Sequence, residues 1–256
     1  RMPLERAEGL ILRLHDFSES SRVVTLYTRE FGKMRALAKG GKRLRSPFES
    51  ALDLLAHARI VLVRKSGGAL HLLTEAVQAT RFGGLRANLE GLNGGYLVAE
   101  LLGDWTEEND PHPRLMDEAL ATLGRLASPG QSAEGARAAV ARFESVLLWE
   151  LGYRPELERC VGCARKALKG PLAFGFGQGG ILCPVCRRDQ RGWRELSDGT
   201  WRVAMELTRQ AAGVEEGEGP LTGCDTATRR QVARWLGEYL SWIRGRRPRL
   251  MGWQET

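Results

Sequence analysis

The chain has 256 residues, enough for one large domain or two to three small ones. Its content of 43% hydrophobic and 27% charged residues is ordinary for a globular protein. No apolar run approaches the ~20 residues of a membrane-spanning helix, so we expect no membrane partner.

The net charge of +7 is distributed unevenly along the chain. Residues 1–86 contain 16 Lys and Arg against 8 Asp and Glu, and residues 151–256 contain 18 against 12. Residues 87–150 contain only 4 against 11. This layout favours a polyanionic partner at the two basic ends, although each charge block taken alone is better explained as a solvated face.

The first part of the chain has the pattern of a small β-barrel. Residues 10–14, 22–28 and 33–39 are rich in alternating or β-branched positions, and two further strands are predicted near 54–64 and 70–79. Five short strands within about eighty residues are typical of a closed or nearly closed barrel, most commonly an OB-fold.

A basic stretch lies in the middle of this predicted barrel. Alternation from residue 33 to 39 puts Met34, Ala36 and Ala38 on one face of a strand and basic side chains on the other. A Gly-Gly loop with further cations follows, and together these groups are suited to a phosphate backbone. The candidate DNA-binding residues are Lys33, Arg35, Lys39, Lys42, Arg43 and Arg45.

Two questions about this stretch stay open from the sequence. The cations are also what an exposed edge strand uses to prevent pairing with another chain. Aromatic side chains able to stack on bases are available nearby, but the sequence does not say which of them face the ligand. These aromatic residues are Phe17, Tyr27, Phe31 and Phe48.

Residues 80–152 are predicted to form an acidic helical bundle. Apolar residues recur at helical spacing near 97–102, from Pro113 onward and after Ser132, which is a candidate N-cap. The glycine pairs at 83–84 and 94–95 are expected to be loops or weak points. We expect the negative face of this bundle to contact a protein partner or solvent rather than DNA.

Four of the five cysteines have the spacing C-x2-C-x19-C-x2-C. Two cysteines three residues apart on a tight turn direct both sulfur atoms at one ion, and two such turns complete a tetrahedron of thiolates. Such a site has no open position for water or substrate, so we predict one structural zinc ion. The predicted ligands are Cys160, Cys163, Cys183 and Cys186.

The alternative to a metal site is a pair of disulfides. Disulfides require an oxidising compartment, and we expect no signal peptide at the start of this chain. The fifth cysteine, Cys224, is expected to be a small core residue or an inert thiol.

The remaining C-terminal residues predict a short β-hairpin and two helices. Alternating aromatic residues and glycines between the cysteine pairs indicate the hairpin, and Ser197 and Asp225 are candidate N-caps for the helices. The arginine-rich segment 244–249 is either a second polyanion contact or a solvated end of the chain.

Several stretches resemble the RecO family of bacterial recombination mediators. In chain order they are Glu8–Arg13, Ser21–Lys33, Ala38–Gly40, Leu151–Leu157 and Gly180–Cys186. The resemblance implies an α+β multidomain fold with an N-terminal OB-fold β-barrel, an α-helical domain and a four-cysteine zinc-binding module. The expected boundaries are 1–80 for the OB-fold, 81–157 for the first helical part, 158–196 for the zinc module and 197–256 for the C-terminal helical part.

The resemblance also implies a function. Members of the family bind single- and double-stranded DNA, anneal complementary strands and work with RecR. They remodel the single-stranded-DNA-binding protein so that RecA can load. We therefore expect a cytoplasmic, nucleoid-associated DNA-repair protein that is not an enzyme, with the 33–45 stretch in the DNA-binding role of the family's OB domain.

Two other function classes compete with this prediction. The chain is alternatively an adaptor that bridges RecR and the acidic tail of the single-stranded-DNA-binding protein, with only generic DNA affinity. A zinc hydrolase or nuclease is disfavoured, because four thiolates close the metal site and no His–carboxylate cluster has the spacing of an open one.

Overall fold

The computed structural model of the chain describes residues 3–43, 46, 48, 51–65, 70–166, 172–213, 221 and 223–255. The chain divides into two compact units, residues 1–131 and 132–256. No helix within the described ranges is long and apolar enough to cross a membrane.

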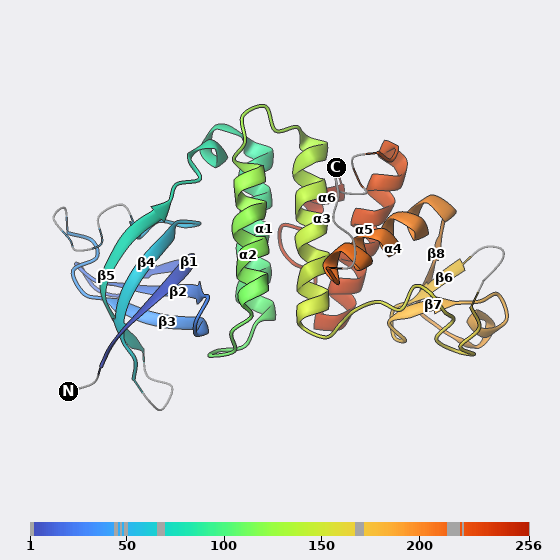
Figure 1. The fold of residues 1–256 in the computed structure, drawn as a ribbon, viewed down its shortest axis with the longest axis horizontal. Helices are drawn as coiled ribbons and strands as arrows, with labels where there is room; N and C mark the ends of the chain where they lie inside the picture. Colours follow the sequence, from blue (N-terminus) through green and yellow to red (C-terminus); the bar gives the residue numbers. More distant parts are fainter. Residues whose placement is uncertain are drawn as a thin grey trace. The chain divides into compact units, whose positions relative to one another are not determined.

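The first unit begins with a five-stranded closed barrel (Figure 1), which confirms the predicted OB-like fold class. The order of the strands is β1-β2-β3-β5-β4, in which β3 and β5 run parallel and the other pairs are antiparallel. The strands are β1 (Leu4–Asp16), β2 (Arg22–Thr28), β3 (Gly32–Ala38), β4 (His57–Val63) and β5 (His71–Thr80).

The barrel core follows from the two-residue period of its strands. On β3, Met34, Ala36 and Ala38 are at most 1% exposed and pack inside the barrel, as the alternation predicts. Lys33 and Arg35 therefore lie on the outside of the same strand.

Two helices pack beside each other next to the barrel in the first unit (Figure 1). They are α1 (Leu89–Trp105) and α2 (Pro113–Leu126), preceded by the short 3-10 helix η2 (Gly83–Ala87). The expectation that residues 94–95 form a loop is wrong, since both lie within α1. A side chain at Gly95 would meet Leu55 Cδ1 at 2.8 Å, so the glycine allows close packing there.

Within its described residues, the second unit combines four α-helices and one short 3-10 helix with a three-stranded sheet of order β7-β6-β8. Ser132, Ser197 and Asp225 each accept a backbone N–H as N-cap of the following helix, which confirms the predicted caps. The elements are α3 (Ala133–Glu150), β6 (Leu172–Gly175), β7 (Gly180–Leu182), η3 (Cys186–Asp189), β8 (Trp193–Leu196), α4 (Asp198–Ala211), α5 (Thr226–Arg244) and α6 (Gly252–Glu255).

An aromatic cluster joins the small sheet to α5. The Phe174 ring lies 5.3 Å from the ring of Trp235 and 5.0 Å from that of Tyr239, both edge-on. The β6–β7 hairpin predicted between the cysteine pairs is present. The strand β8 was not predicted from the sequence.

Candidate metal centre and nucleic-acid interface

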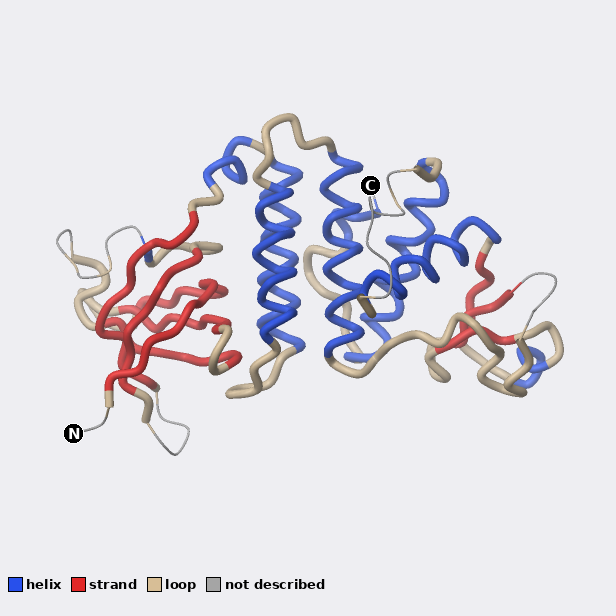
Figure 2. The backbone as a smooth tube through the Cα atoms, in the orientation of Figure 1, coloured by secondary structure: helices blue, strands red, loops and turns tan. Residues whose placement is uncertain are grey.

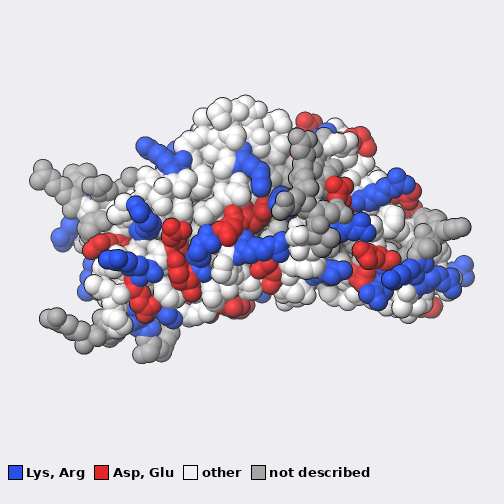
Figure 3. All heavy atoms as spheres, in the orientation of Figure 1, with Lys and Arg blue, Asp and Glu red and all other residues white. Residues whose placement is uncertain are grey.

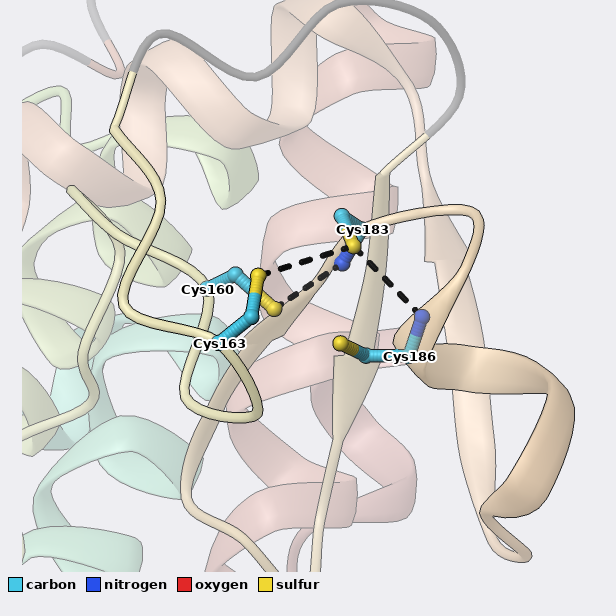
Figure 4. Close-up of side chains that lie close together, drawn as sticks. All are labelled: Cys160, Cys163, Cys183 and Cys186. Atoms are coloured by element: carbon cyan, nitrogen blue, oxygen red, sulfur yellow. Dashed lines mark hydrogen bonds between the residues drawn. The ribbon is translucent and has the colours of Figure 1, made fainter.

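The four paired cysteines meet in the second unit (Figure 4). They come from loops on either side of β6 and β7 and from the first residue of η3 (Figure 2). Their four sulfur atoms all lie within 4.8 Å of one another, although the two pairs are about twenty residues apart in sequence. Cys160 and Cys183 are buried, whereas Cys163 is exposed.

Local backbone geometry brings the two cysteine turns together. The N–H of Cys183 donates to Cys160 Sγ at 3.3 Å, which ties the second turn to the first. A side chain at Gly162 would lie 2.9 Å from Cys186 Cβ and 3.0 Å from Cys186 Sγ. Glycine at this position is therefore needed for the close approach of the turns.

The chemistry of the cluster is that of a cation site. The backbone N–H of Cys186 stabilises the thiolate of Cys183 and lowers its pKa to about 6. Hydrogen bonding to Cys183 and the other neighbouring sulfur atoms raises the pKa of Cys186 to about 12. Four thiolates at this separation repel one another unless a cation lies between them, and four thiolate ligands close a tetrahedral site. The cysteines could thus hold one metal ion in a closed site.

Two of the predicted DNA-binding cations are used inside the first unit. The ammonium of Lys33 donates to the backbone carbonyls of Gly103, at 2.8 Å, and of Thr106. Arg35 pairs with Glu108 at 3.1 Å. These contacts attach the outer face of β3 to the last turn of α1 and to the connection that follows it.

The same region uses further acidic residues to neutralise cations of the barrel. Arg13 pairs with Asp104 at 2.7 Å, and Arg29 pairs with Asp117. Figure 3 shows acidic and basic side chains interleaved over this unit. Some of the acidic side chains that were predicted to face a partner or solvent thus form ion pairs within the first unit.

Three of the other predicted cations, Lys39, Lys42 and Arg43, lie at the turn after β3, residues 39–43, which we call the basic turn. Lys39 and Arg43 are exposed, and within the described residues their side chains have no hydrogen-bond or ion-pair partner. Lys42 contacts Asp16 at 2.8 Å, and this hydrogen bond lowers the pKa of the Asp16 carboxyl. Arg45, the last predicted cation, lies outside the described residues.

The basic turn lies next to the turn between β1 and β2. The Lys42 N–H donates to the Ser20 carbonyl at 3.0 Å, and Asp16 bridges Lys42 and Arg22. Phe17, on this β1–β2 turn, is 62% exposed. The barrel therefore presents cations and one open aromatic ring side by side.

The structure separates Phe17 from the other three aromatic candidates for base stacking. Tyr27 and Phe48 are at most 1% exposed and belong to the protein core. Phe31 is partly buried, and the guanidinium of Arg64 lies 4.6 Å from its ring centre. Among these four rings, Phe17 is the one that is largely exposed and therefore accessible to a base.

Comparison with known proteins decides the family. The model "Recombination protein O N terminal" matches residues 2–82, and "Recombination protein O C terminal" matches residues 86–249. The chain belongs to the RecO family. The resemblance predicted from the sequence is thereby confirmed.

Individual members of the family cover most of the chain. DNA repair protein RecO of Rhodopirellula baltica is 38% identical over 210 residues, which span 81% of this chain and 75% of the relative. The protein of the same name from Roseiflexus sp. is 31% identical over 244 residues, or 95% of this chain and 82% of the relative. The chain therefore belongs to a family of DNA-repair proteins.

Proposed function

We propose that this RecO-family chain binds single- and double-stranded DNA with the basic turn, anneals complementary strands and helps to load recombinase. The observation that carries the proposal is the exposed pair Lys39 and Arg43 beside Lys42, with Phe17 on the neighbouring turn. Arg45 completes this set in the proposal. Lys33 and Arg35 keep a supporting role, because their charged groups hold the end of α1 and the connection that follows it.

Annealing by such a surface needs no catalytic group. Cations that neutralise phosphates on two strands release counterions and let the strands approach each other. Base pairing supplies the free energy, so no nucleotide hydrolysis is needed. The sequence contains no G-x-x-x-x-G-K-[ST] phosphate loop, and we propose that the chain is not an enzyme.

The proposal extends to cofactor, partners and location. We propose a single structural zinc ion on Cys160, Cys163, Cys183 and Cys186, supported by the closed four-sulfur geometry. RecR and the single-stranded-DNA-binding protein are the proposed protein partners, and the bacterial nucleoid in the cytoplasm is the proposed place of action. Membership of a DNA-repair family supports these partners and this location.

Neutralising the basic turn tests the DNA-binding assignment. In the triple variant Lys39→Gln, Lys42→Gln, Arg43→Gln, a single-stranded oligonucleotide is expected to bind at the basic turn at least about tenfold more weakly. Losing three phosphate contacts should also reduce the slope of log affinity against log salt by about 2. Fluorescence anisotropy at several salt concentrations measures both quantities.

A matched control removes the same charge elsewhere on the barrel unit. Arg6, Arg59 and Arg81 are exposed and lie on β1, on β4 and just after β5. Their replacement by Gln should leave affinity and salt slope close to those of the parent. An equal loss in both triple variants would mean that net charge, and not the basic turn, governs binding.

A further inference from the structure

The second unit contains an open hollow of about 800 Å³ between the small sheet and α5. It lies entirely within residues 176–247 and is separate from the four cysteines. Its volume falls in the range of ligand sites in proteins. The side chains that define it are Phe176, Arg194, Arg234, Trp242, Arg246 and Arg247.

The apolar part of the hollow is aromatic. Trp242 is 54% exposed, which is unusual for the largest apolar side chain. The β6–β7 turn lies close to the edge of the Trp242 ring, since a Cβ atom at Gly177 would be 3.3 Å from Trp242 Cζ2. Phe176 lies edge-on to Phe174, at 5.5 Å between ring centres, and Phe174 belongs to the buried aromatic cluster. The rings are thus held by a rigid base.

The charge of the hollow is positive. Glu238 is the only carboxylate among its described lining residues, and Arg194 forms an ion pair with it. Arg234 is exposed on α5, and its side chain has no hydrogen-bond or ion-pair partner within the described part of the chain. Arg246 and Arg247, which follow the end of α5, add positive charge. The site is therefore electrostatically suited to an anion.

We infer that this hollow binds single-stranded nucleic acid, by stacking of a base on Trp242 and contact of the adjoining phosphates with the arginines. Stacking on an aromatic face beside cations is how proteins bind single strands without reading their sequence. An acidic peptide is disfavoured, because the hollow is open and offers no enclosed apolar pocket in which a peptide side chain could be buried as an anchor. Besides the two rings, the lining residues are Gly, Ser, Glu and Arg.

This inference deepens the proposed function, on which it rests. Annealing requires two strands to be held at once, and the basic turn offers one of the contacts. A second single-strand site on the other unit lets one chain hold both strands. The arginine-rich segment near the C-terminus then contributes to a nucleic-acid site with an aromatic platform.

Counting the oligonucleotides bound per chain tests the inference separately from the basic turn. The probe is a short fluorescent oligothymidylate, and sedimentation of the full chain at saturation gives the stoichiometry. We expect the parent to bind two oligonucleotides per chain. The hollow variant Arg234→Gln with Trp242→Ala should bind one, and the basic-turn triple variant should also bind one. A chain that carries both sets of substitutions should bind none. At the hollow, affinity should fall by at least about tenfold. Trp242→Phe should retain most of it, because phenylalanine also stacks.

Matched variants make the result decisive. Arg202→Gln removes one charge from an exposed position of α4 outside the hollow, and should leave two oligonucleotides bound. If Arg234→Gln with Trp242→Ala still binds two, or loses only an acidic peptide probe, the inference is overturned while the basic turn stands. If the basic-turn triple variant still binds two oligonucleotides while the hollow variant binds one, the basic turn does not bind DNA. That result would contradict the proposed function and leave the inference about the hollow intact.

Discussion

Replacing Cys160 by serine is expected to abolish binding of the proposed zinc ion and to lower the melting temperature by about 10 °C. The melting temperature of a unit of this size changes by about 3–5 °C per kcal/mol, so this corresponds to a loss of about 2–3 kcal/mol. The two cysteine turns hold β6 and β7, and β6 carries Phe174 into contact with α5. Loss of the ion should therefore loosen the sheet from the helices.

Thermal denaturation and zinc content of the purified chain measure this effect. The matched control is Cys224→Ser, since Cys224 lies outside the cluster and donates only a long hydrogen bond of 3.6 Å to Leu221. It should keep one zinc ion per chain and the parental melting temperature. A Cys160→Ser variant that is as stable as the parent, but binds DNA less well, would show that the centre contacts DNA directly.

The second large effect is expected at a buried carboxyl group in the second unit. Glu144, on α3, is completely buried, and Gln254 Nε2 donates to its Oε1 at 3.1 Å. Burial raises the pKa of Glu144 from 4.5 to about 8. Within the described structure, Glu144 Oε2 and Gln254 Oε1 both lack a hydrogen-bond donor. A buried carboxylate oxygen without a donor is poorly stabilised, so the site favours the neutral acid.

This raised pKa makes stability depend on pH. Between pH 4.5 and about 8 the folded chain holds a proton on Glu144 that the unfolded chain has lost, so stability falls as the pH rises. The slope approaches about 1.4 kcal/mol per pH unit. Glu144→Gln keeps the acceptor, adds an N–H donor and cannot ionise. The parent should therefore lose about 2–3 kcal/mol relative to this variant between pH 6 and pH 8.

Chemical denaturation at a series of pH values measures this difference. The control is Glu134→Gln, an exposed position on the same helix, for which the difference from the parent should not change over this range. A stability difference between the parent and Glu144→Gln that is constant from pH 5 to pH 8 would show that Glu144 is ionised in the folded chain.

The parts of the structure predicted from sequence are those fixed by short-range patterns. The spacing of the cysteines brings pairs of sulfur atoms together on single turns, and the caps Ser132 and Ser197 act on backbone N–H groups three residues away. Period-two alternation on β3 identified the buried and outer faces correctly.

Contacts between residues distant in sequence could not be predicted in this way. Lys33 finds its carbonyl partners 70 and 73 residues later, and no local pattern marks that pairing. Only the structure shows that Lys33 is bonded within the unit, whereas the cations of the basic turn are exposed. The sequence contains only a weak indication that Glu144 is buried. Glu144 lies four residues from Val140 and four from Leu148, which places it on the apolar face of α3. No such indication exists for its partner Gln254, 110 residues away.

The most direct test of the proposed function is annealing of two complementary oligonucleotides, bare or coated with the single-stranded-DNA-binding protein, without added nucleotide. We predict that the parent chain accelerates annealing of both substrates, and that Lys39→Gln, Lys42→Gln, Arg43→Gln loses most of this acceleration. The Arg6→Gln, Arg59→Gln, Arg81→Gln control should retain it. No acceleration of either substrate by the parent would contradict the proposal and favour an adaptor that acts through its protein partners.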